Sequence, residues 1–389
     1  MATAEAIEPD HEVETEHSVT PLELFFDLVF VLAITQVTAM MADDATWEGL
    51  ARGLLVLGAL WWAWAAYAWL TNTIDPDEGG ARLAVIAAMA GMLVVALAVP
   101  GAFNENAFEF AVAYTFVRLM QLVLYARSAP DVSVYQAVLR MSPTSALSCA
   151  MLIGASFTDG TTQGAIWAAA LLIDYTGVLI GRGRGWSVHP GHFAERHGLI
   201  VIIALGESIV ALGIGASSSA ELEGAEIAAA VLGIVVAAAL WWIYFDVTAL
   251  VAERRLKEAT GQERAELARD SYSYLHLPLV AGIVLLALGT KKTLEYTDKP
   301  LDTIPAVALC GGVGLYLLAQ VARRARAMHT FGVHRFVAAV VAFALIPVAL
   351  ELDALITLAI LAALTSSLVA YEYWRFRESR ARLRASAHA

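Results

Sequence analysis

Twelve long apolar stretches dominate this sequence and limit what it can fold into. A helix needs about 20 mostly apolar residues to cross the hydrocarbon core of a bilayer, and each stretch comes close to that length. Runs such as Leu83–Ala98 lack the alternation of apolar and polar residues that a membrane β-strand requires. The sequence therefore predicts an all-α, polytopic integral membrane bundle with about twelve transmembrane helices. The stretches cover residues 20–42, 48–71, 82–103, 107–127, 137–157, 162–181, 196–216, 226–250, 270–290, 303–322, 335–351 and 353–374.

Composition excludes several other classes of protein. Hydrophobic residues make up 59% of the 389 residues and charged residues 16%, whereas soluble domains contain about 25% charged residues. A soluble chain of this size could not cover so much apolar surface. The net charge of −12 argues against binding to nucleic acid. Two cysteines exclude a disulfide framework or a cysteine-rich zinc module. We expect the lipid bilayer to be the main partner, and we predict no cofactor.

Loop charges predict the orientation of the helices, because cytoplasmic segments carry an excess of Lys and Arg. If residues 1–19 are cytoplasmic, the inner segments hold most of the basic side chains, including those of the tail 377–389. An odd number of spans would place that tail outside. We therefore predict that both termini are cytoplasmic. The outer segments then hold only Arg52, Lys291, Lys292 and Lys299.

The N-terminal segment 1–19 contains six acidic residues and no Lys or Arg. A signal peptide needs a positive region before its apolar core, so we do not expect one here. The composition instead predicts an acidic, disordered tail.

Leu60-Trp61-Trp62 recurs as Leu240-Trp241-Trp242, 180 positions later, which suggests an internal duplication. The alternative is that apolar helices resemble one another by composition alone. A duplication predicts two six-helix units at 20–181 and 192–376, joined by a Gly/Pro/Arg linker at 182–191. Such parallel repeats commonly place a site between the halves. Further matched pairs are Leu28 with Leu199, Ala33 with Ala204, and Ala90-Gly91 with Ala281-Gly282.

Ionisable side chains inside the predicted spans are the main candidates for function. Each costs about 2.5–3.5 kcal/mol at the bilayer centre on insertion scales. Glu207 and Arg118 fall at the middle of their spans, and Asp174 lies near the middle of another. Glu23 and Asp27 are four residues apart and so share one helix face. Glu195, Arg196 and His197 lie near an inner mouth. Together, the candidates for a substrate or ion pathway are Glu23, Asp27, Arg118, Asp174, Glu195, Arg196, His197 and Glu207.

Less specific explanations exist for these residues. Glu207 and Arg118 could simply neutralise each other and fix helix packing. Glu23, Asp27 and Glu195 could be charges solvated at a helix mouth. The run from His189 to His197 matches no zincin motif, and its arginine would repel a dication, so we predict no metal site.

Two segments resemble the bacterial low temperature requirement A (LtrA) family. The first is VTPLELFFDLVFVLAIT at 19–35, and the second is HFAERHGL at 192–199 followed by ALGES at 204–208. The likeness extends over residues 17–376. It implies a multi-pass protein of the bacterial plasma membrane, linked to growth in the cold rather than to a defined reaction. It also draws attention to Glu23, Asp27, Glu195, Arg196 and Glu207.

Three functions fit the sequence. The duplicated halves and the central charges favour a secondary transporter or an ion or proton pathway, which would bind a small solute or an ion. A non-catalytic membrane component of cold adaptation is the second possibility. The third is a membrane-embedded enzyme acting on lipid, for which Glu195, Arg196, His197 and Asp27 form the one candidate cluster. The sequence favours a non-enzymatic role and says nothing about oligomeric state.

Overall fold

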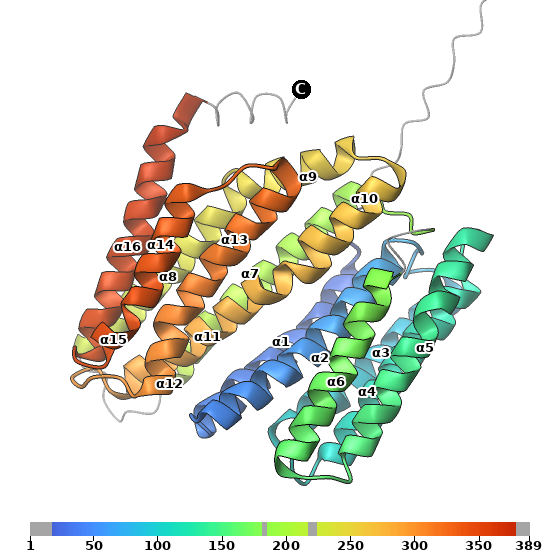
Figure 1. Cartoon of the computed structure of the whole chain (residues 1–389), viewed down its shortest axis with the longest axis horizontal. Helices are drawn as coiled ribbons and strands as arrows, with labels where there is room; N and C mark the ends of the chain where they lie inside the picture. The colour runs from blue at the N-terminus through green and yellow to red at the C-terminus, as the bar shows by residue number, and fades with distance from the viewer. Residues whose placement is uncertain (1–17, 181–184, 217–223, 379–389) are drawn as a thin grey trace, which may run out of the picture.

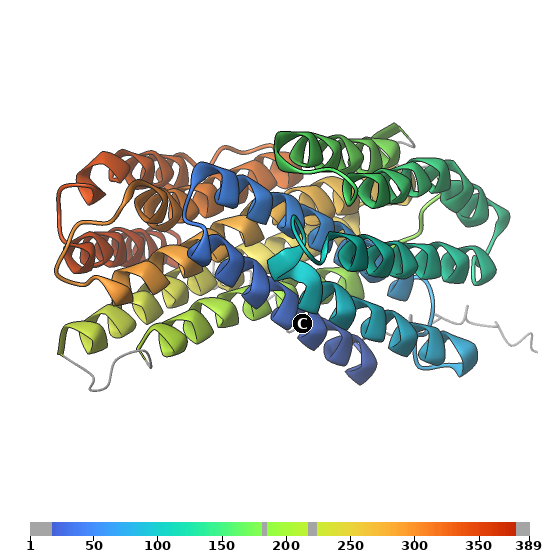
Figure 2. The same ribbon diagram turned by 90° about the horizontal axis from the view of Figure 1, so that it is seen from below.

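The computed structural model describes residues 18–180, 185–216 and 224–378. The predicted all-α class is confirmed: apart from one isolated bridge between Pro300 and Asp353, the described residues form helices and connecting turns. Figure 1 shows two groups of helices side by side, with α1–α6 in one group and α7–α16 in the other. Figure 2 shows the same division after a 90° turn. The predicted tails 1–19 and 377–389 and the predicted linker 182–191 fall wholly or partly outside the described residues.

The first group contains six long helices joined by short turns. The break between α3 and α4 is a 3₁₀ turn, Val99–Gly101, where Pro100 cannot continue an α-helix. The helices are α1 Pro21–Asp43, α2 Trp47–Thr71, α3 Gly79–Ala98, α4 Ala107–Arg127, α5 Val132–Ala155 and α6 Gly160–Ile180.

The second group is more interrupted. Two of its long helices contain a π-helical turn, at Ala268–Tyr274 and Val307–Gly311. Its α-helices are α7 Pro190–Ala216, α8 Gly224–Phe245, α9 Thr248–Glu258, α10 Gly261–Leu267, α11 His276–Glu295, α12 Thr303–Ala306, α13 Gly312–Met328, α14 Val333–Ala344, α15 Ile346–Ala349 and α16 Ala354–Arg375.

Every predicted apolar stretch coincides with a helix, and ten helices within the described residues are long and apolar enough to cross a membrane. The stretch at 335–351 forms the shorter pair α14 and α15. The prediction of a multi-pass helical membrane protein is therefore confirmed. We call one end of the bundle the arginine-rich end; there α2 and α6 end and α1 and α7 begin.

The charged segments 252–269 and 323–334, which lie between the predicted apolar stretches, are helical over most of their length. The first segment forms α9 and α10, and α13 continues to Met328. Both segments carry many charges, which made them look like solvated connections. In α9 these charges pair within the helix, as in Arg254–Glu258 at 3.0 Å, while Leu256 is buried.

The two groups are joined by α1, α2, α7 and α11. The indole nitrogens of Trp61 and Trp69 on α2 donate to the backbone oxygen and the hydroxyl of Ser273, at 2.7 and 2.8 Å. Within the second group, α11 and α13 approach so closely at Gly282 and Gly312 that a Cβ on either would lie 2.7 Å from the other's carbonyl oxygen. Small residues allow this close packing in membranes.

Candidate functional site

Helices α1 and α7 lie side by side and run in the same direction, because both begin at the arginine-rich end. We call their facing surfaces the α1–α7 seam. The polar contacts that cross it include Glu23 with His192, Asp27 with Arg196, and Thr35 with Glu207. The partners in these contacts are 169, 169 and 172 positions apart. The two helices are therefore parallel, and their register is nearly constant along the seam.

Glu23 is fixed by the first turn of α1. Thr20 caps the helix and Pro21 occupies its first turn, and the Glu23 carboxylate accepts the backbone N–H of Thr20 at 2.9 Å. This capping box holds the carboxylate at the helix start. The same oxygen, Oε2, accepts from Nε2 of His192 at 3.0 Å. Glu23 is thus buried and serves both the local helix start and the seam.

Asp27 forms a bidentate ion pair with Arg196. The two guanidinium–carboxylate distances are 3.0 and 3.1 Å. The indole nitrogen of Trp64 donates to Asp27 at 2.9 Å, and the guanidinium lies 5.6 Å from the Trp64 ring. Nε of Arg196 also lies 3.6 Å from Glu23. One guanidinium therefore faces two buried carboxylates.

Asn72 determines the tautomer of His192. The backbone N–H of His189 donates to Oδ1 of Asn72 at 2.8 Å, which identifies the amide oxygen. The Asn72 NH₂ then donates to Nδ1 of His192 at 3.0 Å. His192 with Nδ1 as an acceptor is neutral and donates its Nε2–H to Glu23. The cluster thus has two carboxylates and one guanidinium, a net charge of −1 before any proton or cation binds.

Glu207 lies farther along the same seam. Its carboxylate accepts from the Thr35 hydroxyl of α1, and Lys291 of α11 is near enough to interact with it electrostatically. None of the ion pairs within the described residues includes Glu207. Phe30 and Ile34, both buried, separate Asp27 from the Thr35 level, a distance of about 12 Å at 1.5 Å per residue.

Arg118 does not reach Glu207, so the hypothesis that these two side chains neutralise each other was wrong. Arg118 pairs with Asp174 of α6 at 3.0 Å. Ser145 of α5 donates to the same carboxylate at 2.6 Å and accepts from Arg118 at 3.0 Å. All three side chains are buried inside the first group. Charge is balanced there, and the partners belong to α4, α5 and α6.

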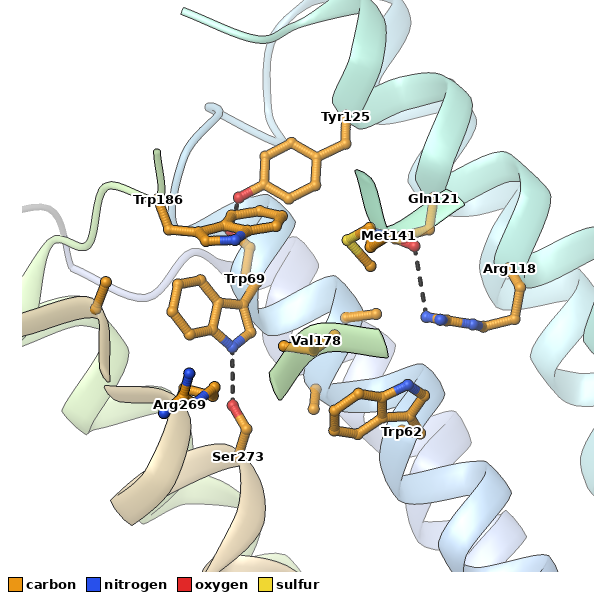
Figure 3. A pocket seen from close by; sticks show the side chains of 13 residues that line it. Trp62, Trp69, Arg118, Gln121, Tyr125, Met141, Val178, Trp186, Arg269 and Ser273 are labelled. Atoms are coloured by element: carbon orange, nitrogen blue, oxygen red, sulfur yellow. Dashed lines mark hydrogen bonds between the residues drawn. The ribbon is translucent and has the colours of Figure 1, made fainter. Parts of the chain in front are cut away.

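A cavity of about 50 Å³ lies beside Arg118 (Figure 3). Its walls are mostly aromatic and apolar, with Trp62, Trp69 and Trp186 among them, and Arg118 bonds to Gln121 at its edge. Ligand pockets commonly measure about 300–1,000 Å³, and a water needs about 10–15 Å³. The cavity can therefore hold a few waters but not a solute.

The remaining candidates point in different directions. Glu195 is exposed and accepts the backbone N–H of Val19 at 3.2 Å. His197 packs against the rings of Trp61, Trp64 and Tyr272, and its Nδ1 contacts the backbone oxygen of Phe193. The predicted cluster of Glu195, Arg196, His197 and Asp27 therefore does not form; only Arg196 and Asp27 meet. Placing Glu23 and Asp27 at a solvated mouth was also wrong, because both carboxylates are buried.

Sequence reasoning missed Thr35 on the seam and missed Trp64 and Asn72, which contact the seam from α2 and its C-cap, and it considered His192 only as a metal ligand. Asn72 and His192 were detectable as polar residues next to apolar stretches. Trp64 and Thr35 carried no such signal, since tryptophan and threonine are common in membrane helices. Within the described residues, no group of three or more His, Cys, Asp or Glu side chains is arranged to hold a metal ion.

Comparison with protein families identifies one family. The family model described as "Bacterial low temperature requirement A protein (LtrA)" matches residues 18–370. The chain is also similar to an uncharacterized protein of Rhizobium meliloti (strain 1021). The two are 30% identical over 310 residues, which cover 76% of this chain and 74% of that protein. The match includes the whole seam.

Proposed function

The chain belongs to the bacterial low temperature requirement A family, and we propose that it is a secondary transporter or ion pathway that carries protons or cations along the α1–α7 seam. The observation that carries the proposal is the charge imbalance at the arginine-rich end of the seam. There Glu23 and Asp27 face a single guanidinium, Arg196, while Asn72 keeps His192 neutral.

A buried charge without a counter-charge is costly in a low-dielectric interior. The excess negative charge of the cluster is therefore neutralised by a proton or a cation. Binding and release of that ion would change the net charge between −1 and 0. Arg196 neutralises the other carboxylate permanently, because a guanidinium does not lose its proton in proteins.

Glu207 provides a second acceptor on the same seam, about 12 Å farther along. Phe30 and Ile34 fill the interval between the two acceptors. An ion cannot cross this apolar interval without movement of α1 against α7. We therefore propose alternating access, in which each carboxylate level opens to one side of the membrane in turn.

We also propose twelve spans in two six-helix units, 20–181 and 192–376, with both termini cytoplasmic. The register of the seam supports the duplication. Residues that contact each other across the seam are 169–172 positions apart in the sequence. This range includes the 171 positions that separate Leu28 from Leu199 and Ala33 from Ala204. Equivalent helices of parallel repeats would meet in this way at an axis along the membrane normal.

A non-catalytic role in cold adaptation remains the second candidate, and the bidentate ion pair of Asp27 with Arg196 favours it, because such a pair can fix helix packing. A lipid-acting enzyme has less support, because Glu195 and His197 point away from Asp27.

Flux measurements on the purified full chain in proteoliposomes test the proposal. A pH-sensitive dye inside the vesicles would report proton movement under an imposed pH or sodium gradient. We expect Asp27→Asn and Glu207→Gln to reduce the flux to near the level of protein-free vesicles. The matched control is Glu109→Gln, which changes an exposed carboxylate of α4 and should leave the flux intact. Unchanged flux in both seam variants would sink the proposal and favour the structural role.

A further inference from the structure

Arg323 on α13 is a buried guanidinium with no carboxylate partner in the described part of the chain. It is 3% exposed, and its Nε and Nη2 have no hydrogen-bond partner there. Nη1 donates to Gln320 at 3.3 Å. The rings of Tyr244 and Tyr272 lie 4.9 and 5.7 Å from the guanidinium carbon. These aromatic faces attract the cation but do not neutralise it.

A second unsatisfied donor lies beside it. The hydroxyl of Ser271, 2% exposed, also has no partner among the described residues. Ser271 belongs to the π-helical turn Ala268–Tyr274, and such turns are frequent at functional sites. Ser271 and Arg323 line one narrow neck of about 10 Å³, together with Thr248 and Arg324. No acidic side chain lines this neck.

The neck adjoins a larger cavity, which we call the vestibule. It has a volume of about 330 Å³ and shares Thr248, Arg324 and Met328 with the neck. That volume lies within the range of about 300–1,000 Å³ for ligand pockets. Its walls are apolar on several sides, with Trp242, Ile243, Val247, Val251 and Phe376.

The charges around the vestibule favour a negative ligand group at the neck. Arg335 is already paired, with distances of 2.6 and 2.8 Å to Glu372. Arg324 donates to the Thr330 hydroxyl at 3.1 Å and forms no ion pair within the described ranges. Asp246 is the other acidic side chain of the vestibule and does not line the neck. Positive charge without a carboxylate partner is therefore concentrated at Arg323 and Arg324.

We propose that Arg323 and Ser271 bind, through one water in the neck, the carboxylate or phosphate group of a ligand whose body occupies the vestibule. The two unsatisfied guanidinium N–H groups and the serine hydroxyl are donors that suit anionic oxygens. The apolar walls suit a small organic acid or the upper part of an anionic lipid. This site lies in the second helix group and does not depend on proton movement along the seam.

Binding measurements on the full chain in nanodiscs test the site. The probes are benzoate and inorganic phosphate in phosphatidylcholine nanodiscs, with benzamide as the uncharged analogue of benzoate. A separate arm replaces phosphatidylcholine with phosphatidylglycerol. Tryptophan fluorescence provides a direct signal, since Trp242 lines the vestibule. Saturable binding of benzoate or phosphate, but not benzamide, identifies a soluble anion. A response confined to phosphatidylglycerol identifies a lipid headgroup.

Variants decide whether Arg323 is responsible. We expect Arg323→Gln to weaken the binding about 10- to 100-fold, because hydrogen bonds to a charged group are lost. Ser271→Ala should weaken it less. Arg254→Gln, which changes an exposed arginine of α9, is the matched control and should bind as the unmodified protein does.

Thermal unfolding separates binding from a structural role. Without anion, Arg323→Gln should raise the Tm, because it removes an uncompensated buried charge. With anion, only the unmodified protein and the control should gain stability. If Arg323→Gln lowers the Tm and binds as tightly as the unmodified protein, the proposal is overturned. It is also overturned if the unmodified protein responds to none of the probes.

Discussion

Arg118 and Arg196 are both fully buried, and each bonds an aspartate at 3.0 Å, yet their surroundings differ in charge. Arg118 has Asp174 as its one carboxylate partner, so that pair is neutral. Arg196 faces Asp27 and also Glu23, so that cluster holds one negative charge in excess. A balanced pair fixes how helices pack. An unbalanced one needs an ion to complete it, and on this difference rests our proposal that the Arg196 cluster, unlike the Arg118 pair, belongs to an ion pathway.

An Asp→Asn substitution should therefore lower the stability strongly at Asp174 and only weakly at Asp27. Asp174→Asn leaves Arg118 as an uncompensated buried cation. We expect it to destabilise the protein by about 3–5 kcal/mol, the range for breaking a buried ion pair. Thermal unfolding in detergent would show a large loss of Tm or of folded protein. An apolar pair, Arg118→Met with Asp174→Leu, should recover much of that stability, and a failure to recover would argue that the pair has more than a packing role.

Asp27→Asn should have a smaller effect on stability, because Glu23 still neutralises Arg196. The substitution replaces one charged hydrogen-bond acceptor by an amide, and we expect a loss of about 1–2 kcal/mol. The measurement is the same thermal unfolding, compared directly with Asp174→Asn. A loss as large as that of Asp174→Asn would show that the cluster is a structural ion pair, and the comparison would then fail.

The smallest effect is expected at the aromatic support of Asp27. Trp64→Phe keeps a ring at this position but removes the N–H that donates to Asp27, and we expect a loss of about 1 kcal/mol. Trp62→Phe is the matched control. The Trp62 indole nitrogen is buried without a partner among the described residues, so its removal costs no hydrogen bond. Equal losses of Tm in the two variants would mean that the bond to Asp27 contributes nothing.

Much of the fold could be predicted because its signals are local. Apolar length predicted the helices, among them a first one over residues 20–42, close to the observed Pro21–Asp43. Burial could not be predicted in the same way. Leu-Trp-Trp occurs on both α2 and α8, but Trp61 and Trp62 are buried whereas Trp241 and Trp242 are 44% and 38% exposed. The leucine is buried in both helices, but the two tryptophans fill a core in one and lie on a partly open face in the other, since neighbouring helices decide what covers them.

For the candidate site, too, part could be predicted from the sequence and part could not. Spacing placed Glu23 and Asp27 on one face, and depth within a span selected Arg118, Asp174 and Glu207. Which arginine meets which carboxylate could not be derived, because that depends on the rotation of one helix against another. Arg323 falls outside the predicted spans, since the apolar stretch before it ends at residue 322. Only the continuation of α13 to Met328 places its guanidinium inside the bundle.

The sequence by itself determined that this chain is an integral membrane protein, which segments form its helices, and which ionisable side chains those helices carry. These properties depend on the composition and periodicity of single segments. Tertiary structure alone decided that Arg118 belongs to Asp174, that Asn72 keeps His192 neutral, that Arg196 faces two carboxylates and that Arg323 faces none within the described residues. Each of these depends on side chains more than 25 positions apart, or on their absence, and such contacts are set by helix packing rather than by any local pattern.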